Sequence, residues 1–283
     1  MKFGQLLEEV YFKCGFRVLR RVATGGTTTT VVDSGLANKF GENKFAQGNN
    51  GGHILFISQT TDRAAPESQY GEVSAYTLPT TTPTFTVPTM SAAAGAGDIY
   101  SVMKPNIPLY EMIAVCNDGL RNLPPLELVD TSLTSSDDTL VYSLPFAVGA
   151  YEIQELHIGN DTDGWQDMRG NYTVPSSGST ANKLIFYNSP PADTIRIRYL
   201  AKHPTLSVYS DYVEKSVPDN VAIAVCCEAA LESIMRKRPS WFNDKTRMAM
   251  WGEVKQAAAD ARMMNPIRTR PASRQRTFNL GDL

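Results

Sequence analysis

The stretch "DTIRIRYLAKHP" (193–204) alternates between apolar and charged side chains in its first half. Ile195, Ile197 and Tyr199 are separated by two arginines. Side chains of a β-strand point alternately to opposite faces, so this spacing predicts a strand with isoleucine turned inward and arginine turned outward. The proline-rich "NSPPAD" before it is typical of a turn. The segment therefore predicts a half-buried strand.

Short runs rich in β-branched and aromatic residues occur in two separate regions. Around the first stretch, between residues 126 and 204, lie "TLVYSLP", "YEIQELHIG", "NYTVP" and "NKLIFYN". Nearer the N-terminus, between residues 22 and 104, lie "TTTTVVDSGL", "GGHILFISQT", "EVSAYTL", "TPTFTVP" and "GDIYSVM". Glycine, proline and asparagine separate these runs, a pattern that is typical of a small antiparallel barrel or sandwich.

Helical spacing appears before, between and after these regions. Apolar residues recur at i, i+3, i+4 and i+7 through residues 2–20, which predicts an N-terminal helix ended by "TGG". A second helix is predicted in "PLYEMIAVCNDGLRNLPP", where Pro124 marks the stop. Two further helices are predicted in "PDNVAIAVCCEAALESIMRKR" and "WFNDKTRMAMWGEVKQAAADARMM", which Pro239 separates.

This order predicts an α+β fold with a helical bundle core, two inserted antiparallel β modules and an extended C-terminal arm. The expected segments are a core helix over 1–21, the first β module over 22–104, a core helix over 105–125, the second β module over 126–204, a helical pair over 205–264 and a basic arm over 265–283.

Composition limits the classes of function. The 283 residues are 42% hydrophobic and 20% charged, which is ordinary for a globular protein, and the net charge of −2 excludes nucleic-acid binding through overall charge. The N-terminus lacks the features of a signal peptide, and no apolar stretch approaches the length of a membrane span. We therefore expect a soluble protein that folds in a cytoplasm.

Four cysteines, Cys14, Cys116, Cys226 and Cys227, lie in segments with helical spacing. The chain has no CxxC pair, so zinc and thioredoxin-like chemistry have no support. We expect reduced, buried thiols, and we expect the adjacent Cys226 and Cys227 to point in different directions.

The sequence predicts no catalytic centre, metal site or cofactor. GxxxxGK[ST], GxSxG and HExxH are absent, and His53, His157 and His203 are far apart. In "GNDTDGWQDMRGN", Asp161, Asp163 and Asp167 crowd a glycine turn that could hold a hard cation, although their spacing does not match an EF-hand loop. A hairpin turn is favoured there, and Asp137 and Asp138 are likewise interpreted as a turn pair. Cation binding by the three aspartates stays open.

The C-terminal segment "NPIRTRPASRQRTFNLGDL" (265–283) has no core periodicity. Its two prolines oppose a helix, and arginine can form forked bonds to carboxylates or phosphates. We interpret it either as an unstructured terminus or as an arm that orders on a partner protein. The candidate binding residues are Arg268, Arg270, Arg274, Arg276, Phe278 and Leu280. A nucleic-acid contact is less favoured, because only Phe278 could stack on a base.

The predicted segments follow one another in the order given above and include the stretches "PLYEMIAVCNDGLRNLPP", "NSPPADTIRIRYLAKHP" and "VPDNVAIAVCCEAALESIMRKR". In this order and in these stretches, the chain resembles the head–tail connector (adaptor or neck) proteins of tailed bacteriophages. The resemblance covers most of the chain. It implies a helical core and a ring, commonly of twelve copies, beneath the portal of the head. DNA would pass through the lumen without specific binding, and the arm over 265–283 would dock on the portal. The two β insertions are a departure from the simplest adaptors, and they leave open which position in the neck the protein occupies.

We therefore expect a structural virion protein at the head–tail junction, assembled in the host cytoplasm, with its own copies, the portal and the next tail or neck protein as partners. A membrane partner is not expected. One alternative is a tail or baseplate protein with glycan-binding β modules, for which Trp165 is the candidate stacking residue. An enzyme such as a cell-wall hydrolase is another alternative, which the missing catalytic motifs disfavour.

Overall fold

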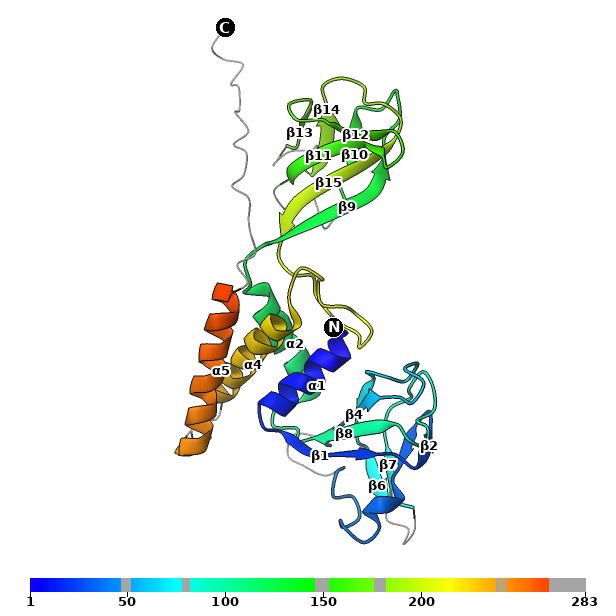
Figure 1. Cartoon of the computed structure of the whole chain (residues 1–283), viewed down its shortest axis with the longest axis vertical. Helices are drawn as coiled ribbons and strands as arrows, with labels where there is room; N and C mark the ends of the chain where they lie inside the picture. The colour runs from blue at the N-terminus through cyan, green and yellow to red at the C-terminus, as the bar shows by residue number, and fades with distance from the viewer. Residues whose placement is uncertain are drawn as a thin grey trace. The chain divides into compact units, whose positions relative to one another are not determined.

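The chain forms two compact units in a computed structural model (Figure 1). The described residues are 1–46, 52–77, 82–145, 153–175, 182–237, 240 and 243–264. The first unit comprises Met1–Leu123 and the segment that begins at Pro204, and the second unit comprises Pro124–His203. The chain therefore leaves the first unit, folds the second and returns.

The described part of the fold is mostly β, so the prediction of a helical-bundle core is wrong. It contains four antiparallel sheets with fifteen strands, and four α-helices. The helix expected over 2–20 ends at Lys13, because Gly15 adopts a positive φ of 75° that breaks helical geometry. The following "RVLRRV" forms a strand instead. Apolar spacing alone did not separate the short helix from the strand that follows it.

The four helices all belong to the first unit. They are α1 (Phe3–Lys13), α2 (Leu109–Arg121), α4 (Asp219–Lys237) and α5 (Lys245–Met264). Helix α4 packs against each of the other three. Among the described residues, none of these helices combines the length and the apolar character needed to cross a membrane.

Small side chains on α4 let its neighbours approach closely. Cys226 and Cys227 lie about 100° apart around the helix axis. Cys226 accordingly reaches α2, where its thiol donates to the carbonyl oxygen of Cys116 at 3.4 Å, and Cys227 reaches Cys14 just after α1. All four cysteines are buried, as predicted. Hydrogen bonding to Cys227 and burial raise the pKa of the Cys14 thiol well above its usual value, so it stays protonated at neutral pH.

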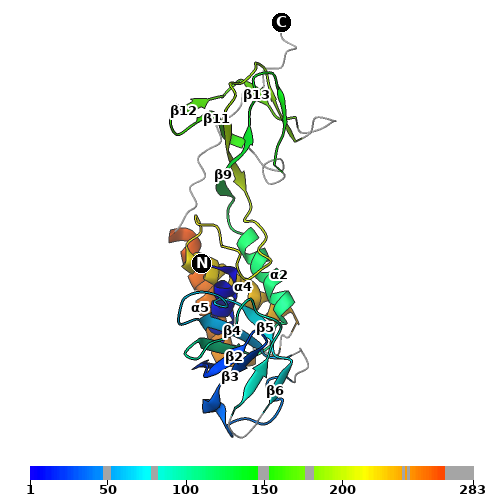
Figure 2. The same cartoon turned by 90° about the vertical axis from the view of Figure 1, so that its right-hand side faces the viewer.

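Two four-stranded sheets complete the first unit, in the orders β1-β8-β4-β5 and β2-β3-β7-β6. Figure 2 labels β4 and β5 of the first sheet and β2, β3 and β6 of the second. Their strands are β1 (Arg17–Val22), β2 (Gly25–Thr27), β3 (Thr30–Val32), β4 (Ile54–Gln59), β5 (Tyr70–Glu72), β6 (Ala75–Thr77), β7 (Thr84–Thr86) and β8 (Ile99–Met103). One hydrophobic cluster takes Leu55 and Tyr100 from the first sheet and Val31, Tyr76 and Phe85 from the second. The two sheets therefore share a core.

The second unit contains a four-stranded sheet, ordered β12-β11-β15-β9, and a three-stranded sheet, ordered β10-β14-β13. The strands are β9 (Leu126–Thr134), β10 (Val141–Ser143), β11 (Ile153–Asn160), β12 (Gly164–Asp167), β13 (Tyr172–Thr173), β14 (Lys183–Phe186) and β15 (Thr194–Ala201). Strand β15 alternates strictly between buried and half-buried residues. Ile195, Ile197 and Tyr199 join a core with Leu184 and Phe186 of β14. The inward orientation predicted for these three residues is confirmed.

Gly119 of α2 lies where α2 and α4 approach closely. A Cβ atom at this position would lie 2.9 Å from the carbonyl oxygen of Val225 and 3.3 Å from the Cα of Cys226. Both are backbone atoms, so relief requires one helix to move. In contrast, a Cβ atom at Gly252 of α5 would meet nothing within 4 Å.

These two glycines give a matched test of the helix packing. Replacing glycine by alanine in a helix gains about 0.5–1 kcal/mol from propensity. Overpacking a tight contact costs roughly 1–3 kcal/mol. We expect Gly252→Ala to raise the free energy of unfolding by the first amount and Gly119→Ala to lower it by roughly 1–2 kcal/mol. Chemical denaturation followed by circular dichroism measures both, and a Gly119→Ala protein as stable as the Gly252→Ala protein would contradict the packing described.

Candidate interaction surface

The outer face of the four-stranded sheet in the second unit gathers charged and aromatic side chains. Arg196 and Arg198 of β15 occupy the positions between its buried residues. On β11, His157 is paired with Arg196 and Glu155 is paired with Arg198. Trp165 of β12 lies beyond them at the edge of the sheet. We call this set of residues the outer sheet face.

Arg198 links three strands across the outer sheet face. Its Nε lies 3.1 Å from Glu127 Oε1 on β9, and its Nη1 lies 3.0 Å from Glu155 Oε2 on β11. These side chains are between about a fifth and a third exposed. Ion pairs with such access to water contribute about 0–1 kcal/mol each. The pairs therefore add little to the free energy of folding, and their main effect is to favour this register of the three strands.

Trp165 is already engaged on this face. The guanidinium carbon of Arg196 lies 4.1 Å from the centroid of its ring, within the range of a cation–π contact. Its Nε1 donates to Asp161 Oδ1 at 2.9 Å. A sugar that stacks on Trp165 would have to use the opposite face of the indole and find another donor.

The three aspartates near this tryptophan have separate partners. Asp161 accepts from Trp165, Asp163 accepts from Asn160 Nδ2 at 2.9 Å, and Asp167 accepts from the amide of Arg169 at 2.9 Å. Strands β11 and β12 form the hairpin that the sequence predicted here. In the part of the chain that the structure describes, no group of three or more His, Cys, Asp or Glu side chains is placed to hold a metal ion. These carboxylates organise the turn.

The other polar residues considered in the sequence analysis are likewise separated from one another. Asp137 and Asp138 lie in a turn, as predicted, and Asp137 also accepts from the amide of the distant Ala192 at 3.0 Å. His53 belongs to the first unit, whereas His157 and His203 belong to the second. Burial lowers the pKa of His53, whose Nδ1 lies 3.1 Å from the carbonyl oxygen of Phe45. His203 is buried and His157 is half-buried on β11.

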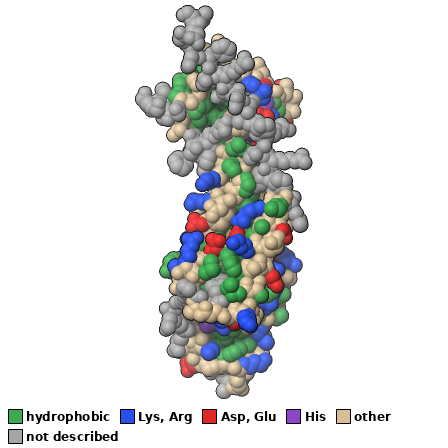
Figure 3. Space-filling view, turned by 90° about the vertical axis from the view of Figure 1, so that its left-hand side faces the viewer, with side chains coloured by type: hydrophobic (Ala, Val, Ile, Leu, Met, Phe, Trp, Pro, Cys, Tyr) green, Lys and Arg blue, Asp and Glu red, His purple; other side chains and the backbone are tan. Residues whose placement is uncertain are grey.

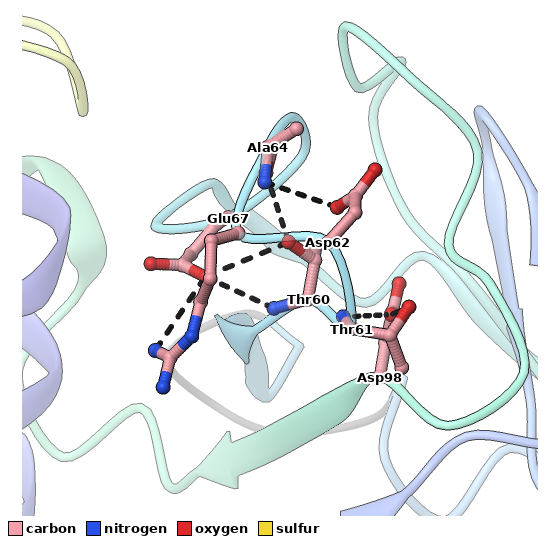
Figure 4. A network of polar contacts seen from close by, with 7 residues as sticks. Thr60, Thr61, Asp62, Ala64, Glu67 and Asp98 are labelled. Atoms are coloured by element: carbon pink, nitrogen blue, oxygen red, sulfur yellow. Dashed lines mark hydrogen bonds and ion pairs between the residues drawn. The ribbon is translucent and has the colours of Figure 1, made fainter.

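In the first unit, carboxylates concentrate around the loop after β4 (Figure 4). Glu67 Oε2 accepts from the amide of Thr60 at 3.1 Å, and Asp98 Oδ1 accepts from the amide of Thr61 at 3.0 Å. Asp62 Oδ1 accepts from the amide of Ala64 at 3.0 Å, and this bond lowers the pKa of the Asp62 carboxyl. Each acid binds a backbone N–H group, so the network fixes the path of the loop.

Asp33 forms a buried polar centre that sequence reasoning missed. Its carboxylate accepts from Arg21 Nε at 2.6 Å, from the Tyr100 hydroxyl at 2.7 Å and from the amide of Gly35 at 2.9 Å. Burial, followed by the hydrogen bond to Asp33, raises the pKa of the Tyr100 hydroxyl far above its usual value. Only the cap-like "VVDSGL" hinted at a role for Asp33, because its other partners come from distant strands.

A small cavity lies between α2 and α4. It has a volume of about 190 Å³ and is lined by Asn106, Pro108, Glu111, Ser233 and Lys237, among others. Ligand pockets usually measure about 300–1,000 Å³. Glu111 already accepts from Ser233 at 3.0 Å and from Lys237 at 2.6 Å. Glu111, Ser233 and Lys237 therefore satisfy one another in the wall of the cavity.

The predicted docking residues lie outside the described residues: Arg268, Arg270, Arg274, Arg276, Phe278 and Leu280. Comparison with known proteins gives no family, since no protein-family model matches the chain and no curated protein matches it significantly.

The contrast between the buried and the exposed charge networks is testable. Asp33→Ala leaves a buried hydroxyl and a guanidinium without their acceptor, and breaking such a pair costs roughly 3 kcal/mol. Arg198→Met removes two partly exposed ion pairs, and we expect a loss of about 1 kcal/mol or less that shrinks in high salt. Denaturation curves at low and high ionic strength distinguish the two, and equal losses would contradict the roles given to Asp33 and Arg198.

The glycan alternative makes its own prediction at Trp165. Because Arg196 and Asp161 already engage the indole, we expect the full chain to bind no saccharide on a bacterial glycan array. Binding that is abolished by Trp165→Ala but retained by Tyr187→Ala, which removes an exposed aromatic of the same unit, would favour the glycan-binding role instead.

Proposed function

We propose that this chain is a structural protein of a tailed-bacteriophage virion that forms a ring joining the portal of the head to the tail. The resemblance of its ordered segments to head–tail connectors is the basis of the proposal. One structural observation supports it. Two of the resembling segments fold as α2 and α4, which pack against each other at Gly119, and the chain between them folds as the separate unit Pro124–His203.

The use of polar side chains also supports a structural role. The carboxylates of Asp33, Asp98 and Glu67 accept hydrogen bonds from backbone amides within the first unit. Each therefore holds a loop or strand in place. None of these bonds joins a nucleophile to a general base, the arrangement that covalent catalysis needs.

The proposed arm comprises residues 265–283, with Arg268, Arg270, Arg274, Arg276, Phe278 and Leu280 as the contacts to the portal. Arginine suits this task, because its planar guanidinium binds carboxylates in a forked geometry. A ring presents many identical arms to one partner, so each arm needs only a weak contact. The overall charge of −2 fits a lumen through which DNA passes without being held, since phosphate binding grows with the number of neutralising cations.

Deleting residues 265–283 tests this role. We expect the truncated chain to keep the circular-dichroism spectrum and thermal transition of the full chain, because the described helices and strands all lie upstream of residue 265. We expect it to lose binding to the portal of the same phage, measured by co-sedimentation and negative-stain electron microscopy. A full-length variant with glutamine at the four arginines separates charge from length. A truncated chain that still binds the portal normally would refute the role of the arm.

A further inference from the structure

All four cysteines of the chain meet at one place in the first unit. Cys14 lies just after α1, Cys116 lies in α2, and Cys226 and Cys227 lie in α4. Helix α4 packs against both α1 and α2, as Figure 1 shows. The chain has only four cysteines among its 283 residues, so their position at one helix junction sets this place apart from the rest of the core.

The four thiols form two pairs that join different helices. Cys226 and Cys116 are hydrogen-bonded through their side chains, and the Cys226 thiol also lies 3.4 Å from the carbonyl oxygen of Cys116. Cys227 and Cys14 are hydrogen-bonded through their side chains in the same way. Neighbouring residues of a helix point about 100° apart, so α4 places one thiol toward α2 and the next toward α1. Each pair therefore has two sulfur atoms in contact across a helix boundary.

The helix backbones are close together at the first pair. Gly119 lies three residues after Cys116 on α2, and residues three apart lie on the same face of a helix. A Cβ atom at Gly119 would lie 3.3 Å from the Cα atom of Cys226. A disulfide requires Cα atoms about 4.4–6.8 Å apart, so it needs a close helix contact of this kind. The missing side chain of Gly119 thus allows the approach that a bond between Cys116 and Cys226 requires.

Packing keeps these thiols slow to react. The four cysteines are each 2% exposed or less. Hydrogen bonding and then burial raise the pKa values of the Cys14 and Cys116 thiols well above the usual range, so little of the reactive thiolate is present at neutral pH. In Figure 3, which views the side with α5, hydrophobic and charged side chains are interspersed at the surface, and the buried thiols contribute almost nothing to it. An oxidant therefore reaches the sulfur atoms only when the helices open.

We propose that Cys14–Cys227 and Cys116–Cys226 are two disulfide sites, which stay reduced in a reducing medium and close when the chain meets a low-molecular-weight disulfide. The inference does not depend on the proposed ring function, because it follows from contacts within one chain. Under that function, the chain would fold in a reducing cytoplasm and later meet oxidising surroundings in the released particle.

Each bond forms in two exchange steps. One cysteine loses its proton, and its thiolate attacks the small disulfide to form a mixed disulfide and release one small thiolate. The thiolate of the paired cysteine then attacks the protein sulfur of the mixed disulfide, and the second small thiolate leaves. The two protein thiols are oxidised by two electrons, the small disulfide is reduced by two electrons, and the two protons end on the released thiols.

The two bonds would fasten the helix contacts of the first unit. A bond between Cys116 and Cys226 closes a loop that contains the whole second unit, Pro124–His203. A bond between Cys14 and Cys227 closes a longer loop and ties the end of α1 to the same helix. In the entropic account of disulfide stability, bonds that close long loops restrict the unfolded chain most. We therefore expect the oxidised chain to unfold at a higher temperature than the reduced chain.

Oxidation of the full chain tests the sites without any substitution. The folded chain is incubated with oxidised glutathione just below its thermal transition, and its free thiols are then counted with a chromogenic thiol reagent in denaturant. We expect the count to fall from four to none without cross-links between chains on non-reducing gels. The midpoint of thermal unfolding should rise by roughly 5 °C or more. Dithiothreitol should restore the four thiols and the original midpoint.

Two matched variants identify the pairing, which is needed because the adjacent Cys226 and Cys227 share their proteolytic peptide. Cys226→Ala should retain the bond between Cys14 and Cys227 and leave the Cys116 thiol free. Cys227→Ala should retain the bond between Cys116 and Cys226 and leave the Cys14 thiol free. Mass spectrometry of non-reduced digests, with the free thiols alkylated beforehand, distinguishes these products.

Three outcomes would overturn the proposal. The first is a wild-type chain that keeps four free thiols after this treatment. The second is a bond between Cys226 and Cys227, between Cys14 and Cys116, or between two chains. The third is an oxidised chain that is less stable than the reduced one. The first and third use the unaltered chain, so they hold even where a variant fails to fold. Portal binding after deletion of 265–283 bears only on the ring function, so the two failures are distinguishable.

Discussion

The contact between α2 and α4 is the constraint on which the first unit depends. The chain leaves this unit after α2 and returns only at Pro204, so the contact closes a long excursion. Gly119 allows the two helices to approach with backbone atoms in contact range. Asn117 holds the returning chain, because its side chain donates to the carbonyl oxygen of Leu206 and accepts from the amide of Leu206, both at 2.8 Å. Lengthening such a closed loop adds little entropic cost, so the second unit can occupy it.

The sequence predicted those elements whose periodicity is carried by a single buried face. Strand β15 was recognisable because its isoleucines alternate with arginines, and α4 because Val221 and Val225 recur at helical spacing. The relative amounts of helix and sheet were not recognisable from the sequence. Helix α1 and strand β1 follow each other within one amphipathic run, and only the conformation of Gly15 separates them. Local patterns also do not reveal that the core is built mainly from sheets and that the helices cover only part of it.

The polar centres were hidden for a different reason. Asp33 is bound by Tyr100, a residue 67 positions away, and Trp165 is covered by Arg196 from another strand. Such pairs depend on strand order, which no local spacing encodes. Once the strands are placed, most of these groups bind within the fold, as Arg198 binds Glu127 and Glu155. The carboxylates that looked like candidate ligands in the sequence are therefore largely used to hold turns and registers.

Charge that is not used inside the fold remains for contacts outside it. The carboxylates of Glu67 and Asp98 are committed to backbone amides of their own loop. A single exposed ion pair contributes at most about 1 kcal/mol, so one such contact between two copies would be weak. Closure of a ring changes this balance, because removing one copy breaks two interfaces and the arms at once. Under the proposed function, a chain with weak and salt-sensitive contacts stays separate while it is synthesised and becomes stably held only when the ring is complete.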